Sequence, residues 1–259
     1  MKKFLLLVLM SVSLLAADKK NPASKAYITD VEGQATVFVG EGRIEDSKKR
    51  EVYAAEGIVL ETEKKSNQSL VLSNGTGIYM DEVTHLEVKK FVQEPFTPNR
   101  SDLDMEPSIS QTGGLISHGY VAICTPKIVA GSRMVYTTPH GEIKLFNNKV
   151  AINVGDNATE VIPVEGEFKV ELRSGHFEII KVGDRVIFDG QIITTRKADK
   201  KEMDKATENV AIACNARKTV YFDVVKRYES DGVIEILVAY PVTQIKLPTE
   251  FTVSPATIK

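Results

Sequence analysis

The side chains best suited to chemistry are few and widely spaced along the chain. Four histidines match no metal-binding spacing: His85, His118, His140 and His176. Ser132 lacks the flanking glycines of a nucleophile elbow. The acidic run Asp102, Asp104 and Glu106 lacks the glycine of a calcium loop, and Gly113-Gly114 precedes no phosphate-binding lysine. The sequence therefore predicts no metal, no cofactor and no enzyme.

Two cysteines, Cys124 and Cys214, are the remaining candidate site. In an oxidising compartment they could form a disulfide across a loop of about 90 residues, worth roughly 4–5 kcal/mol in a chain-entropy estimate. Two buried free thiols on strands are the alternative, because residues 121–123 and 210–213 are apolar. The sequence leaves both states open, and the spacing matches no zinc site.

The N-terminus has the composition of a signal peptide. Residues 1–17 hold two lysines followed by an apolar run of about 14 residues, too short for a membrane span of about 20. We therefore expect cleavage, no transmembrane span afterwards, and a periplasmic or secreted protein. Loss of Lys2 and Lys3 lowers Lys plus Arg from 33 to 31 against 35 acidic residues, a net charge of −4. This charge argues against a nucleic-acid partner.

Alternation of polar and apolar residues dominates the rest of the chain. It occurs in residues 34–39, 167–172 and 176–180, among others, and places apolar side chains on one face of each strand. Asn74-Gly75 fits a tight turn, and Ser230-Asp231-Gly232 separates two alternating segments of a hairpin. Short strands with turns between them predict an all-β, solenoid-like or sandwich-like fold.

The expected organisation has one main domain and a smaller C-terminal part. Residues 26–192 form a β domain of two related halves, joined by a proline-rich loop at 93–112. Residues 193–209 are expected to be a linker or a short helix, and residues 210–259 a β-hairpin region with a tail.

Short motifs in a fixed order resemble the FecR-type domain over about residues 27–192. They include Gly57-Ile58-Val59-Leu60, Thr137-Thr138-Pro139-His140-Gly141 and residues 164–170, Val-Glu-Gly-Glu-Phe-Lys-Val. The resemblance implies a solenoid-like extracytoplasmic domain, which in founding members relays a signal from an outer-membrane receptor to a sigma factor. Only three residues precede the apolar run, so no cytoplasmic segment that could bind a sigma factor is expected here.

Three functions follow as hypotheses. The first is a non-catalytic cell-envelope protein that binds an unknown protein partner or acts as a scaffold, since an open sheet edge can accept a partner strand. The second is an extracytoplasmic sensor or regulator of transmembrane signalling. The third is an envelope glycan-acting enzyme, which would need two carboxylates at catalytic separation.

Overall fold

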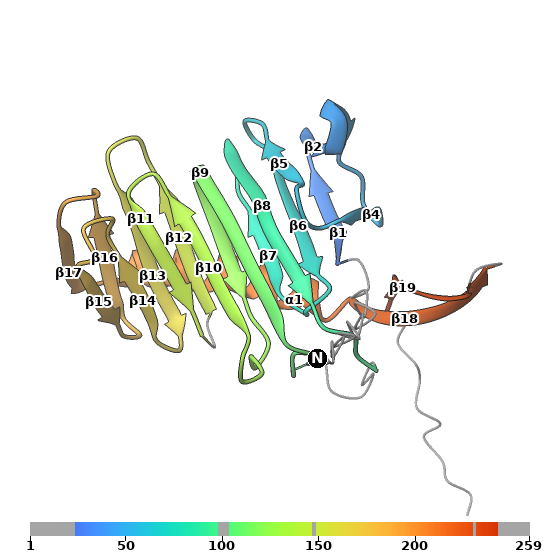
Figure 1. Ribbon diagram of the computed structural model, residues 1–259. Helices are drawn as coiled ribbons and strands as arrows, with labels where there is room; N and C mark the ends of the chain where they lie inside the picture. Colours follow the sequence, from blue (N-terminus) through green and yellow to red (C-terminus); the bar gives the residue numbers. More distant parts are fainter. Residues whose placement is uncertain (1–23, 98–103, 147–148, 230–231, 243–259) are drawn as a thin grey trace, which may run out of the picture.

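The computed structural model describes residues 24–97, 104–146, 149–229 and 232–242. Within these residues 17 strands build two stacked sheets that share one long strand, and two further strands form a separate hairpin (Figure 1). A single α-helix occurs in this part of the chain, and the sheets do not close into a barrel. The predicted all-β fold is therefore confirmed.

One sheet, termed the helix-covered sheet, lies at the back of Figure 1. Its strands in spatial order are β4 (Val52–Ala54), β1 (Lys25–Glu32), β6 (Asn67–Leu72), β7 (Gly77–Met80), the second half of β9 (Ser110–Cys124), β12 (Lys149–Val154), β13 (Thr159–Glu165), β16 (Asp184–Phe188) and β17 (Ile193–Lys197).

The other sheet, termed the open sheet, faces the viewer in Figure 1. Its strands in spatial order are β3 (Arg43–Asp46), β2 (Ala35–Val39), β5 (Val59–Thr62), β8 (Thr84–Gln93), the first half of β9, β10 (Arg133–Thr138), β11 (Gly141–Leu145), β14 (Phe168–Glu171) and β15 (Phe177–Ile180). A short 3-10 helix, Gly40–Gly42, lies between β2 and β3.

Strand β9 belongs to both sheets. Its residues 110–118 pair with β8, and residues 119–124 pair with β7 and β12. Gly119 stands where the strand passes from one sheet to the other, with a φ of +93° and a hypothetical Cβ only 2.3 Å from Thr84 Oγ1. Glycine fits this position because, without a Cβ, it adopts a positive φ readily and does not clash with Thr84.

The main core lies between the two sheets and comes from the inward positions of the alternating strands. Its largest fully buried members include Tyr136, Phe168, Phe188, Leu60 and Ile116. Burying side chains of this size stabilises a fold by about 1.5–3 kcal/mol each, before entropy costs. The alternation in the sequence therefore corresponds to one face of each sheet turned toward this core.

The C-terminal boundaries differ from those predicted. Residues 193–197 are strand β17, and helix α1 (Lys200–Arg217) runs well beyond 209, so a linker or short helix at 193–209 is wrong in extent. The hairpin begins at Val220 rather than at 210, with β18 (Val220–Glu229) and β19 (Gly232–Pro241). The proline-rich loop is shorter than 93–112, because β8 ends at Gln93 and β9 begins at Ser110.

Three predicted features fall partly or wholly outside the described residues: the signal peptide at 1–17, the Ser230-Asp231 turn and the tail from 243 to 259.

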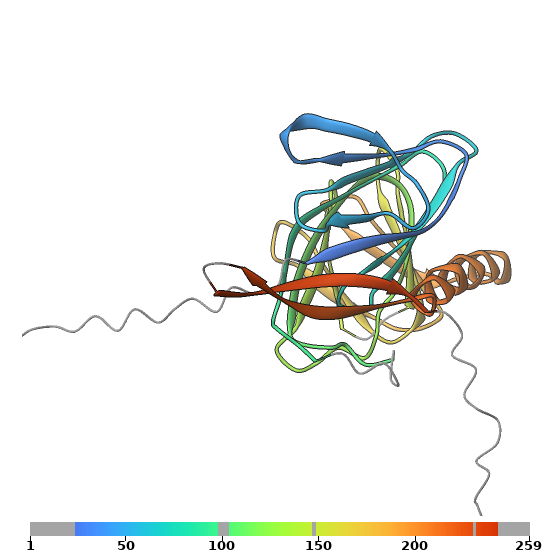
Figure 2. The same ribbon diagram turned by 90° about the vertical axis from the view of Figure 1, so that its right-hand side faces the viewer.

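Helix α1 lies on the outer face of the helix-covered sheet, away from the core, as the turned view shows (Figure 2). The β18–β19 hairpin, termed the arm, follows α1 and extends from the β1 side of the molecule (Figure 1).

Candidate functional site

The two cysteines meet between α1 and the helix-covered sheet. Cys124 ends strand β9, Cys214 lies on α1, and their sulfurs are bonded with a Cα–Cα distance of 5.2 Å. Placing Cys214 on a strand was wrong, because residues 210–213 belong to a helix, on which Val210 and Ala213 face the sheet while Ile212 is exposed. The disulfide therefore joins the helix to the strand that both sheets share.

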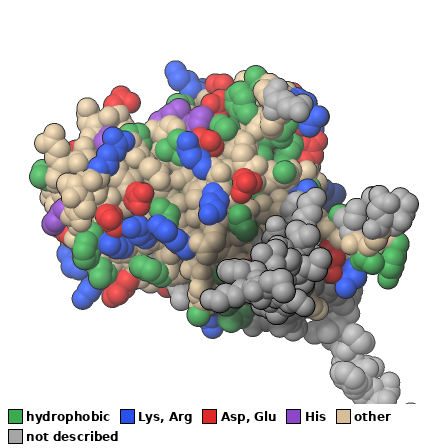
Figure 3. Space-filling view, viewed as in Figure 1, with side chains coloured by type: hydrophobic (Ala, Val, Ile, Leu, Met, Phe, Trp, Pro, Cys, Tyr) green, Lys and Arg blue, Asp and Glu red, His purple; other side chains and the backbone are tan. Residues whose placement is uncertain are grey.

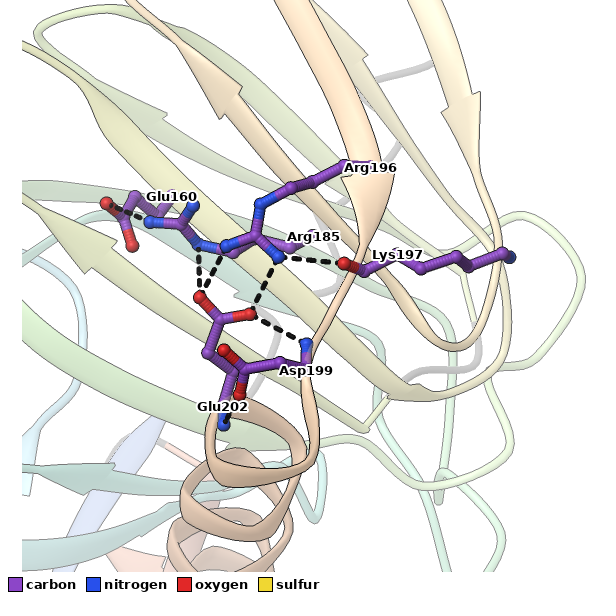
Figure 4. Close-up of polar contacts among 6 residues, drawn as sticks. All are labelled: Glu160, Arg185, Arg196, Lys197, Asp199 and Glu202. Atoms are coloured by element: carbon purple, nitrogen blue, oxygen red, sulfur yellow. Dashed lines mark hydrogen bonds and ion pairs between the residues drawn. The ribbon is translucent and has the colours of Figure 1, made fainter.

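The N-terminal end of α1 makes a second attachment to the sheet (Figure 4). Glu202 accepts hydrogen bonds from Arg196 at 2.6 and 2.9 Å and lies 3.3 Å from Arg185 Nε. Arg185 also pairs with Glu160 at 2.6 Å, and Asp199 and Glu202 cap the helix reciprocally. These bonds, those from Arg196 foremost, lower the pKa of Glu202 to about 2. The cluster fixes the helix and leaves no free reactive group.

The histidines lie apart from one another, except for His85 and His118. Their rings are 5.8 Å apart, and His85 Nδ1 lies 2.8 Å from Glu61. His140 is buried and hydrogen bonded to Thr159 at 2.9 Å. Within the described ranges no group of three or more His, Cys, Asp or Glu side chains is placed to hold a metal ion.

The structure brings together two candidates that the sequence keeps apart, Glu106 and Ser132. Glu106 is buried and accepts hydrogen bonds from Ser132 Oγ at 2.6 Å, Ser110 Oγ at 2.5 Å and the Val129 amide at 2.9 Å. These donors satisfy the carboxylate, which fastens the segment before β9 to the β9–β10 connection. Asp102 lies outside the described residues, and Asp104 lies 3.6 Å from Arg217.

A groove of about 250 Å³ on the open sheet contains two carboxylates that the sequence did not single out, Glu142 and Glu171. They stand opposite each other on β11 and β14. Lys144 and Lys169 approach Glu171 to 2.5 and 2.8 Å, and their hydrogen bonds lower its pKa to about 2. A carboxylate held ionised in this way cannot serve as the proton donor of glycoside cleavage. The groove is suited to binding charged or polar groups.

Strand β15 begins two residues after Gly175, which lines this groove, and it is the outermost strand of the open sheet. Within the described residues it pairs with β14 alone, and half of the backbone groups of an edge strand point away from the sheet. Phe177 and Ile179 lie on its outer face and are 51% and 59% exposed. The Lys169 ammonium sits 3.9 Å from the centre of the Phe177 ring. We take this strand as the candidate docking site.

The orientation of β15 reverses what its alternation predicts. Alternation over residues 176–180 would place Phe177 and Ile179 in the core and Glu178 in solvent. Instead Glu178 stands opposite the fully buried Val170, on the core side, because Ile180 occupies the buried position opposite Phe168. The edge therefore exposes its apolar side chains and turns its carboxylate inward.

The face of the open sheet is mixed in character. Basic, acidic and apolar side chains lie interspersed over it, as Figure 3 shows. Helix α1 packs against the strands of the other sheet, so the open sheet is the broad face free for contact within the described parts.

Among the described helices, none is long and apolar enough to cross a membrane.

Comparison with known proteins identifies no family. No protein-family profile and no curated protein matches this chain. Two crystal structures of a "putative anti-sigma factor" from Parabacteroides distasonis ATCC 8503 align with 8% and 10% identity. Each gives a TM-score of 0.42, and the alignments cover 69% and 71% of this chain and 97% and 99% of those chains. At this TM-score and identity no function is transferred.

Proposed function

We propose that this chain is an exported, non-catalytic protein-binding module of the cell envelope that docks its partner along β15. The observation that carries the proposal is the inverted edge strand, which presents Phe177 and Ile179 to solvent beside the outward-pointing backbone groups of an edge strand. An added strand would satisfy those backbone groups and cover both apolar side chains. Export rests on the composition of residues 1–17.

Ile44 supplies a matched control for the docking experiment. It lies on β3, the strand at the opposite edge of the open sheet, and is 60% exposed, close to the exposure of Ile179. The same substitution at the two positions therefore tests the location of binding rather than the general effect of a surface change.

A photo-reactive amino acid placed at position 177 or 44 in native cells provides the test. We expect position 177 to cross-link to a defined envelope protein, position 44 not to do so, and Ile179→Lys to abolish the cross-link. Ile44→Lys should leave it intact. Equal cross-linking from both edges, or insensitivity to Ile179→Lys, would show that β15 is not the docking site.

Export is tested separately by fractionation and intact mass. We expect the mature protein outside the cytoplasm with a mass lowered by the leader residues 1–17. Full-length protein retained in the cytosol would contradict this part of the proposal without bearing on the edge strand.

A regulatory role in transmembrane signalling is the second proposal, and it rests on the ordered motifs of residues 27–192 that resemble FecR-type domains. A cross-linked partner that belongs to a transmembrane signalling complex would favour this role over a structural scaffold. The groove gives the glycan-acting alternative no proton donor in Glu171, because Lys144 and Lys169 hold this carboxylate in ion pairs.

A further inference from the structure

The inward carboxylate of Glu178 gives the docking edge a chemical preference. Glu178 Oε2 accepts a hydrogen bond of 3.1 Å from Thr195 on β17, so the side chain lies at the end of the sandwich, between the outer strands of the two sheets. Its ion-pair partner in the described part of the chain is His176, at 3.9 Å. The contact is long and both side chains are more than a third exposed, so it neutralises the carboxylate little.

A strand added beside β15 would remove Glu178 from water. The side chain is now 37% exposed, and a neighbouring strand would place its own core-side residue directly opposite. Burial of a carboxylate costs several kcal/mol unless a cation or several donors accompany it. An apolar or acidic residue at that position is therefore disfavoured, and a lysine or arginine is favoured.

The outer face of β15 determines which residues are favoured at the two partner positions that flank the one opposite Glu178. Residues of the partner strand opposite Phe177 and Ile179 would lie against side chains that are 51% and 59% exposed, so apolar residues gain most there. Inward-pointing charges on edge strands also prevent indiscriminate pairing. At β15 the same carboxylate would reject most strands and admit one that brings a cation.

We propose that the partner docks through an extended segment of another protein with an apolar–basic–apolar pattern, its basic residue opposite Glu178. This inference rests on the proposed function, because it specifies the ligand of the same edge.

Two dye-labelled synthetic peptides test the pattern by fluorescence anisotropy. One carries Val-Lys-Val and the other Val-Glu-Val in the same alternating Thr/Val background. We expect the lysine peptide to bind the wild-type protein at least about tenfold more tightly, a difference of about 1.4 kcal/mol. Glu178→Lys should reverse the preference, Ile179→Lys should abolish binding of both peptides, and Ile44→Lys should change nothing.

The outcomes separate this inference from the proposed function. Equal binding of both peptides, lost in Ile179→Lys, would overturn the basic preference and leave β15 as the docking edge. Binding of neither peptide, together with no cross-link from position 177, would overturn both. Light scattering measures self-association. If the wild-type protein forms oligomers and Ile179→Lys returns it to monomers, the occupant of β15 is a second copy of this chain, and the proposal of a separate partner protein is wrong.

Discussion

Gly77 sets how closely helix α1 approaches the sheet. A Cβ at this position would lie 2.1 Å from the carbonyl oxygen of Ala213, a backbone atom that cannot move without the helix. The small side chains on the sheet-facing side of α1, Ala206, Ala213 and Ala216, fit the same close approach. Cys214, the residue after Ala213, forms its disulfide with Cys124 beside this contact.

Gly77→Ala is therefore expected to destabilise the protein by about 1–3 kcal/mol, as overpacked positions do. Urea unfolding measures the loss. Gly113→Ala is the matched control, because its Cβ would make an ordinary 3.5 Å contact with Lys90. Equal stability of the two variants would show that the helix is not held at this distance.

Glu171 gives the fold a defined acid sensitivity. Its pKa is lowered from 4.5 to about 2 by hydrogen bonds from Lys144 and Lys169, so its contribution is present above pH 4.5 and is lost as the pH falls toward 2. We expect Glu171→Gln to be less stable than the wild type at neutral pH. The difference in urea midpoint should shrink steadily between pH 4.5 and pH 2. A difference independent of pH would contradict this assignment.

At the scale of elements, the C-terminal half of α1 is the part of the fold that the sequence did not predict as a helix. Its sheet-facing residues recur at helical spacing, Ala206, Val210, Ala213 and Ala216, but most are alanines, which carry little hydrophobic signal. Residues 210–213 consequently read as a strand. The helix is held by a disulfide, a close glycine contact and a cluster of ion pairs, and none of these adds to the hydrophobic periodicity of its own residues.

Removal of the disulfide tests its contribution. The bond closes a separation of 90 residues, for which the chain-entropy estimate is roughly 4–5 kcal/mol. We expect Cys124→Ala/Cys214→Ala to lose up to this amount in urea unfolding, and dithiothreitol to destabilise the wild type but not the variant. Wild-type stability that reductant leaves unchanged would indicate that the thiols are free or the bond inaccessible.

In its described residues the arm packs against the rest of the protein near its base. Val220, Phe222 and Leu237 pack against Tyr27 and Val71 near its base, whereas Tyr228 toward the tip is 80% exposed. A two-stranded hairpin has little stability without such packing. The arm should therefore open from its tip.

Hydrogen–deuterium exchange tests this gradient. Amides around Tyr228 are expected to exchange much faster than those around Phe222, at equal protein concentration. Uniform protection along the arm, particularly if it grows with concentration, would show that the outer half is covered in solution.

At the scale of the whole molecule, alternation predicts strands but not their neighbours. The segment 176–180 was recognisable as a strand, yet its position at the edge of the open sheet follows from pairings across the whole chain. Its orientation was also unpredictable, because the register opposite Phe168 and Val170 outweighs the local pattern. The candidate docking site therefore emerges only once the strand order is known.

The shared strand β9 has a consequence for how the chain matures. Strands β7 and β8, made earlier, each pair with β9, β8 with residues 110–118 and β7 with residues 121–124, so both pairings are complete only when residue 124 has emerged. Until then the nascent chain carries two strand edges without their partner, both prone to mispairing. Any factor that shields the unfinished chain during its delivery would matter most before the first cysteine appears.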